Sequence, residues 1–176
     1  MKKILIALGV LLISTQIAMA EVWQVRKIKN DFEGYSFVRI HTEYLKLNQP
    51  LEFPYRDLKA VAAVDCSGNS ETFHLIFSMN PNFTNYTLSK VGNELYKQVE
   101  VQVKRDNDKY GAYPVRAINK TGSSQLIFDD KYLLNTNTKI LMLQMDFYSG
   151  TRHITIDMSK RPKCSEHITI THTGTQ

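Results

Sequence analysis

The sequence has little cysteine, proline or glycine. Its 176 residues include two Cys, five Pro and eight Gly, and 43% of them are hydrophobic. A collagen-like or low-complexity chain would hold more glycine and proline, and a disordered chain would be less apolar. Two cysteines form at most one bridge, which excludes a scaffold held together by many disulfides. The length suits one domain with a hydrophobic core.

Common enzyme and metal motifs are also missing. The sequence contains no CxxC, HxH, HExxH, GxSxG, GxGxxG or P-loop pattern. His153 and Asp157 would share a strand face, but about 13 Å apart, too far to hold one ion. Asp106, Asp108 and Gly111 fit part of a calcium loop, but Ala117 stands where its glutamate is needed. We therefore predict no catalytic residues, no metal and no cofactor.

The one long apolar run lies at the N-terminus. Lys2 and Lys3 precede an apolar stretch at 4–13, and the segment ends on Ala18-Met19-Ala20. This order is typical of a secretory signal peptide, and ten residues are too few to span a membrane. We expect residues 1–20 to be removed. Residues 21–176 would then form one soluble domain of an exported bacterial protein, either periplasmic in the envelope or secreted.

The net charge gives little support for a nucleic-acid partner. The chain has 22 Lys and Arg against 17 Asp and Glu, a formal charge of +5. Removal of the two signal-peptide lysines leaves 20 against 17, or +3. Acidic and basic residues are mixed along 104–109 instead of forming a basic stripe. We predict no binding of nucleic acid.

The expected export predicts the state of the two cysteines. Cys66 and Cys164 are the only pair, and an oxidising compartment favours a disulfide over free thiols. The sequence therefore predicts a Cys66–Cys164 bridge that joins distant parts of the mature chain.

Alternation of apolar and polar residues predicts mostly strands. It is clearest in four segments, 98–104, 140–147, 153–158 and 167–172. Shorter candidates are 22–28, 35–40, 60–65, 72–79, 115–118 and 125–128. Connections such as Ser67-Gly68-Asn69 and Ser149-Gly150-Thr151 are too short for a crossover helix, so neighbouring strands should be antiparallel.

One segment has a helical spacing. Leu88, Val91 and Leu95 recur at intervals of three and four, which predicts a short helix within 85–97, although Gly92 weakens it. We expect an all-β fold, an antiparallel β-sandwich or barrel-like single domain with at most this one helix.

Two polar stretches carry aromatic residues. Residues 80–87 contain Phe83 and Tyr86, and residues 109–114 contain Tyr110 and Tyr113. Aromatic rings with Asn and Gly on loops are typical of binding surfaces, although such rings also pack beneath loops as part of the core. We predict Phe83, Tyr86, Tyr110 and Tyr113 as binding residues.

The order of several segments resembles small periplasmic accessory proteins of type VI secretion systems. The segments are Cys66 with its hairpin, the valine-rich strand that ends at Lys104-Arg105-Asp106, and the late hairpin of 141–150 and 154–158. The resemblance covers about half of the mature chain and implies an envelope protein, with no site to carry over.

The expected function is binding without catalysis. The partner would be another envelope or extracellular protein, or a glycan, as for an accessory or secretion-associated factor. One alternative is a small exported hydrolase that acts on the cell wall or a polysaccharide, which requires converging histidines and carboxylates. Another is an inhibitor or immunity-type protein that blocks a hydrolase.

Overall fold

A computed structural model of the chain describes residues 22–30, 35–68, 70–106, 108, 111–128, 131–134 and 137–168. The predicted signal peptide at 1–20 lies outside these residues. Within the described ranges there are eleven strands, two 3-10 turns and no α-helix. None of these elements is a helix long and apolar enough to cross a membrane.

The first five strands form the N-terminal half of a single antiparallel sheet. They are β1 (Gln24–Asn30), β2 (Tyr35–His41), β3 (Leu45–Lys46), β4 (Lys59–Ser67) and β5 (Ser70–Phe77). The remaining strands are β6 (Tyr86–Val91), β7 (Glu94–Arg105), β8 (Tyr113–Lys120), β9 (Gln125–Phe128), β10 (Ile140–Phe147) and β11 (Gly150–Asp157). The 3-10 turns are η1 (Lys131–Leu134) and η2 (Cys164–Glu166).

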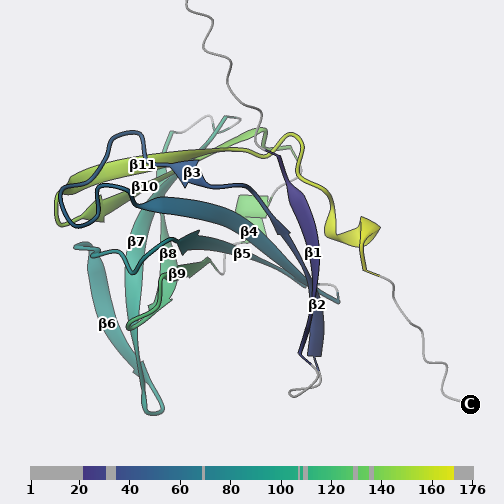
Figure 1. Cartoon of the computed structure of the whole chain (residues 1–176), viewed down its shortest axis with the longest axis horizontal. Coiled ribbons are helices and arrows are strands. Elements are labelled where there is room, and N and C mark those ends of the chain that lie inside the picture. The colour runs from purple at the N-terminus through teal and green to yellow at the C-terminus, as the bar shows by residue number, and fades with distance from the viewer. Residues whose placement is uncertain are drawn as a thin grey trace, which may run out of the picture.

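The sheet bends around one core without closing. Its strand order is β1-β2-β4-β5-β9-β8-β7-β10-β11, with β3 beside β4 and β6 beside β7. Figure 1 shows the resulting arch, in which β10 and β11 run across the top while β6–β9 and β1–β2 descend on opposite sides. The first and last strands of this order, β1 and β11, approach each other. The indole nitrogen of Trp23, which precedes β1, donates to the carbonyl of Asp157 in β11 (2.8 Å). The prediction of an all-β antiparallel domain is confirmed.

Alternation along the strands supplies the core. Val99, Val101 and Val103 of β7 have no exposed surface, and Leu141 and Leu143 of β10 are equally buried. A strand points successive side chains to opposite faces, so one apolar face per strand is sufficient to build this core. Phe73 and Phe128 complete it from β5 and β9, with ring centroids 5.4 Å apart.

Two secondary-structure predictions differ from the structure at residues that it describes. The segment 85–97 is not a helix but a hairpin, in which Tyr86–Val91 pairs with Glu94–Val99 around Gly92 and Asn93. Hydrogen bonding to the neighbouring strands outweighs a three-and-four spacing that only three apolar residues support. The strand predicted at 167–172 is not present at His167 and Ile168, which follow η2, and 169–172 lie outside the described residues.

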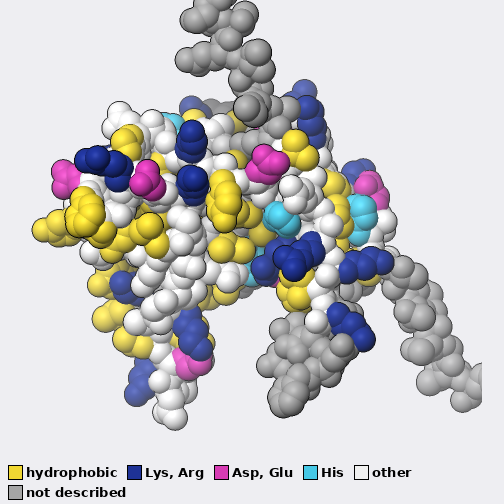
Figure 2. All heavy atoms as spheres, in the orientation of Figure 1, with side chains coloured by type: hydrophobic (Ala, Val, Ile, Leu, Met, Phe, Trp, Pro, Cys, Tyr) yellow, Lys and Arg dark blue, Asp and Glu magenta, His cyan; other side chains and the backbone are white. Residues whose placement is uncertain are grey.

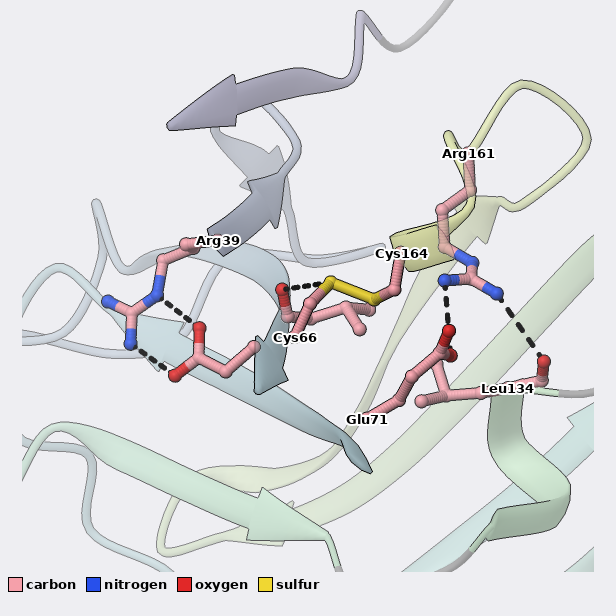
Figure 3. The surroundings of a disulfide bond; sticks show 8 residues. Arg39, Cys66, Glu71, Leu134, Arg161 and Cys164 are labelled. Atoms are coloured by element: carbon pink, nitrogen blue, oxygen red, sulfur yellow. Dashed lines mark hydrogen bonds and ion pairs between the residues drawn. A yellow bond between two sulfur atoms is a disulfide. The ribbon is translucent and has the colours of Figure 1, made fainter. Parts of the chain in front are cut away.

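The predicted disulfide is confirmed. Cys66 and Cys164 are bonded, with Cα atoms 5.6 Å apart and a sequence separation of 98 positions. Cys66 lies on the core face of β4 and Cys164 begins η2, so the bond joins the C-terminal segment to the middle of the sheet (Figure 3).

Candidate functional site

The three predicted binding aromatics that the structure describes, Phe83, Tyr86 and Tyr113, do not form one surface. Phe83 belongs to the core, with 1% of its surface exposed, and its ring lies 5.3 Å from that of Phe147 and 5.7 Å from that of Phe77. The backbone explains this burial: the amide of Thr84 donates to the carbonyl of Asp146 (3.0 Å), which seats the segment against the end of β10. Phe83 therefore offers no ring to a partner, and this part of the prediction is corrected.

Tyr86 and Tyr113 lie apart, on β6 and β8. Tyr86 is 38% exposed, and the Lys97 ammonium sits 4.5 Å from its ring centre. Tyr113 is half-buried, with the Arg105 guanidinium 5.6 Å from its ring centre. Their pairing partners on β7 are four residues apart, or about 13 Å along the strand. Tyr110 lies outside the described residues, and the binding role of these tyrosines remains a prediction.

The most exposed aromatic rings lie elsewhere. Phe53 is 88% exposed and Tyr148 is 81% exposed. They rim a depression of about 250 Å³, called here the aromatic-rimmed depression. Its lining residues include Leu51, Phe53, Tyr55, Asn82, Tyr148 and Ser149.

Local structure explains the exposure of both rings. Phe147 ends β10 with its side chain in the core, so Tyr148 begins the turn to β11 and faces solvent. Phe53 lies in a loop whose ends are anchored by Leu51 and Leu58, each 4% exposed. The anchors hold the loop to the core while its middle projects outward.

Hydrogen bonds join the two loops that carry these rings. The amide of Glu52 donates to the hydroxyl of Ser149 (3.4 Å). The Arg152 guanidinium donates to the carbonyls of Pro50 (3.3 Å) and Ser149 (3.2 Å), one on each loop. Figure 1 shows the loop before β4 beside the β10–β11 turn, and Figure 2 shows hydrophobic side chains gathered at that end. The rings are thus held on connected backbone.

Sequence reasoning missed this depression. Each of its loops contributes a single exposed ring. The loops are far apart in the sequence, since Glu52 and Ser149 are separated by 97 positions. The available signal was the aromatic residue Tyr148 directly before a Ser-Gly turn. The 80–87 stretch does reach the site, but through Asn82.

A polar cluster occupies the face of the sheet opposite the core. Arg39 of β2 donates through Nε and Nη2 to the two carboxylate oxygens of Asp65 on β4, at 2.6 and 2.7 Å. His74 of β5 brings Nε2 to 3.2 Å from Asp65 Oδ2, and its Nδ1 contacts the Gln125 amide. We call these four residues the Arg39–Asp65 cluster.

The charge state of Asp65 follows from this environment. Burial opposes ionisation of its carboxyl, but the Arg39 guanidinium and His74 more than offset this effect. The pKa of Asp65 therefore lies below its ordinary value, and the carboxylate stays ionised.

The Arg39–Asp65 cluster bears on the hydrolase alternative. A catalytic histidine needs one ring nitrogen directed at a nucleophile or a water. Here Asp65 faces one nitrogen of His74 and Gln125 faces the other, while Arg39 binds both oxygens of Asp65. Among the residues that the structure describes, no three His, Cys, Asp or Glu side chains are placed to hold a metal ion. The cluster is arranged to join β2, β4, β5 and β9.

The fold and the depression together define an all-β protein with exposed aromatic rings on connected loops. Comparison of the chain with protein-family models, curated proteins and solved structures finds no match in any of the three.

Proposed function

We propose that this protein is exported and binds another protein, or a glycan, through the aromatic-rimmed depression, without catalysing a reaction. The observation that carries the proposal is the exposure of Phe53 and Tyr148 around one hollow. Large rings on a rigid support give extensive contact at low entropic cost. Burying one such ring contributes up to about 3 kcal/mol.

Polar groups beside the rings would orient the ligand. Asn82 supplies amide donors and an acceptor, and Ser149 and Tyr55 supply hydroxyls. A few polar groups among apolar ones are usual in binding pockets. A protein loop or a sugar with apolar ring faces would match this lining.

The disulfide supports the location. The Cys66–Cys164 bond is consistent with an oxidising compartment outside the cytoplasm. The signal-peptide pattern at 1–20 supports export, and the resulting envelope location would place the depression where extracellular proteins and glycans occur.

The test compares binding by the wild type and by a Phe53→Ser/Tyr148→Ser double variant. Each is used as bait for envelope extracts and applied to a glycan array. For any ligand that the wild type binds, we expect the affinity of the double variant to be lower by about tenfold or more. Its unfolding curve should stay unchanged.

Tyr44→Ser is the matched control, because Tyr44 is 67% exposed and does not line the depression. Equal binding by the double variant, or an equal loss in the control, contradicts the assignment of the site. A captured hydrolase that loses activity in the complex assigns the inhibitor role.

A further inference from the structure

A second depression lies at the opposite end of the β10–β11 hairpin. It has a volume of about 340 Å³, and we call it the basic pocket. Its lining includes Thr138, Lys139, Met158, Ser159, Arg161 and Lys163. The amide of Met158 donates to the carbonyl of Lys139 (2.7 Å), so the segments before β10 and after β11 stay side by side.

Thr138 has an unsatisfied hydroxyl in this lining. The residue is 3% exposed, and its Oγ1 makes no hydrogen bond to any part of the protein that the structure describes. A buried hydroxyl without a partner is costly, and such groups call for a specific explanation. Thr138 lines the pocket, so this unpartnered hydroxyl lies at the pocket wall.

Arg161 places a buried positive charge in the same lining. Its side chain is 7% exposed. Its guanidinium lies 3.5 Å from a carboxylate oxygen of Glu71 and 3.5 Å from the carbonyl oxygen of Leu134. Figure 3 shows the side chain directed at these two groups. Charge-assisted hydrogen bonds are normally 2.7–2.9 Å long. Glu71 and the Leu134 carbonyl therefore orient the Arg161 guanidinium but form only long, weak hydrogen bonds with it.

Two lysines add charge around Arg161. Lys139 and Lys163 also line the pocket, and both are exposed. Three carboxylates contact lining residues without lining the pocket themselves: Glu71 contacts Arg161, Asp106 accepts from the amide of Lys139, and Asp157 accepts from the hydroxyl of Ser159. Three cationic residues, together with Thr138 and its unpartnered hydroxyl, thus line a hollow whose described lining contains no acidic side chain.

We infer that the basic pocket binds a phosphate group carried on a larger molecule. Guanidinium and ammonium groups are the usual partners of phosphate, and the Thr138 hydroxyl can donate to a further phosphate oxygen. A volume of about 340 Å³ exceeds that of one phosphate and leaves room for the group that carries it. The source is a soluble phosphoester or a phospholipid headgroup.

The test is an NMR titration of the folded protein with glycerol 3-phosphate at low salt. We expect amide shifts to be confined to 137–139 and 158–163, and to weaken steeply as sodium chloride is added. Sodium chloride alone at equal ionic strength is the control for screening. Absence of localised shifts, together with absence of binding to phosphatidylglycerol vesicles, overturns the proposal.

Variants separate a built site from general attraction to a positive surface. Thr138→Val removes the hydroxyl at nearly constant volume, and we expect it to weaken binding about tenfold. Lys163→Gln tests the same site at an exposed position, so a folding failure of Thr138→Val leaves the proposal testable. Lys90→Gln, an exposed lysine on β6, should bind as the wild type does. Equal binding by Lys163→Gln, or an equal loss in Lys90→Gln, contradicts the pocket.

Vesicles identify the source. If the wild type sediments with phosphatidylglycerol vesicles but not with phosphatidylcholine vesicles, and Lys163→Gln abolishes that sedimentation, the ligand is a lipid headgroup. Localised shifts with glycerol 3-phosphate and no sedimentation assign a soluble phosphoester. Sedimentation that Lys163→Gln leaves unchanged shows that another surface binds the membrane and overturns the inference for this pocket.

Discussion

Phe53 and Phe83 have the same side chain and opposite environments. Phe53 is 88% exposed beside a hollow, and Phe83 is 1% exposed between two other aromatic rings. Both precede or follow proline, asparagine or other loop-forming residues in the sequence. The difference therefore arises from what the folded backbone places around each ring.

The first prediction concerns these two residues. Phe83→Ala removes a ring from the core and leaves a cavity, so we expect it to lower the free energy of unfolding by about 3–5 kcal/mol. Phe53→Ala should change that free energy by less than about 0.5 kcal/mol, because its ring contributes little to packing. Chemical denaturation measures both. Similar losses in the two variants contradict the assignment of Phe83 to the core and Phe53 to the surface.

Asp65 provides a pH-dependent prediction. Its pKa is lower in the folded protein than in the unfolded chain, so its charge stabilises the fold above an unfolded pKa of about 4. That stabilisation is lost as the pH falls through the folded pKa. We expect Asp65→Asn to lower the free energy of unfolding at pH 7 by about 1–3 kcal/mol, because Arg39 loses its carboxylate.

In the Asp65→Asn variant, the free energy of unfolding should also fall less steeply than in the wild type as the pH is lowered. Urea denaturation from about pH 7 to pH 2 measures this dependence. Exposed Asp57, changed to Asn, serves as the control and should retain the wild-type profile. If Asp65→Asn and wild type lose stability in parallel as the pH falls, Asp65 does not supply the proposed charge effect.

At the scale of elements, the β6–β7 hairpin shows how pairing overrides local pattern. Strand β7 pairs with β8 along one edge, and its other edge is divided between β6 and β10. The β6 ladder, and the end of the β8 ladder at Tyr96 and Lys97, use backbone groups that a helix at 85–97 would withdraw from β7. The apolar spacing of Leu88 and Leu95 yields exposed side chains on the hairpin.

The turn of this hairpin gives the third prediction. Gly92 has a φ of 59°, and an added Cβ would meet no atom within 4 Å. Gly92→Ala therefore introduces backbone strain without a clash, and we expect a cost of about 1–2 kcal/mol to the hairpin. Hydrogen exchange of the β6 and β7 amides measures the cost. Asn93→Ala, at the neighbouring position without a positive φ, should change exchange far less; equal effects contradict the strain argument.

At the scale of the whole molecule, the disulfide joins regions that the sheet ladder does not pair directly. Cys66 is in β4 and Cys164 follows β11, the last strand of the order. Only the bent sheet allows these residues to meet. The same bend places the Trp23 ring against the end of β11.

The fourth prediction is the effect of removing this bridge. A link across 98 positions restricts the unfolded chain, so a Cys66→Ala/Cys164→Ala variant should lose about 2–5 kcal/mol of unfolding free energy. Denaturation with and without reductant measures the loss, and reductant should not destabilise the variant further. Two alkylatable thiols in unreduced wild type would contradict the bridge.

The sequence by itself determined the fold class, most strands and the disulfide. Alternation marks the buried face of each strand because side chains project to opposite sides of a sheet, and this is a local property. The segment at 140–147 was predicted with the bounds that β10 has. Two cysteines left one possible pairing.

Only the tertiary structure decided which surfaces are available for binding. Phe83 is buried because the chain beside it pairs with β10, whereas Phe53 and Tyr148 share a hollow because two distant loops meet. The basic pocket likewise joins residues before β10 to residues after β11. Such sites depend on contacts between distant segments, and the local alternation of apolar and polar residues does not specify which distant segments meet.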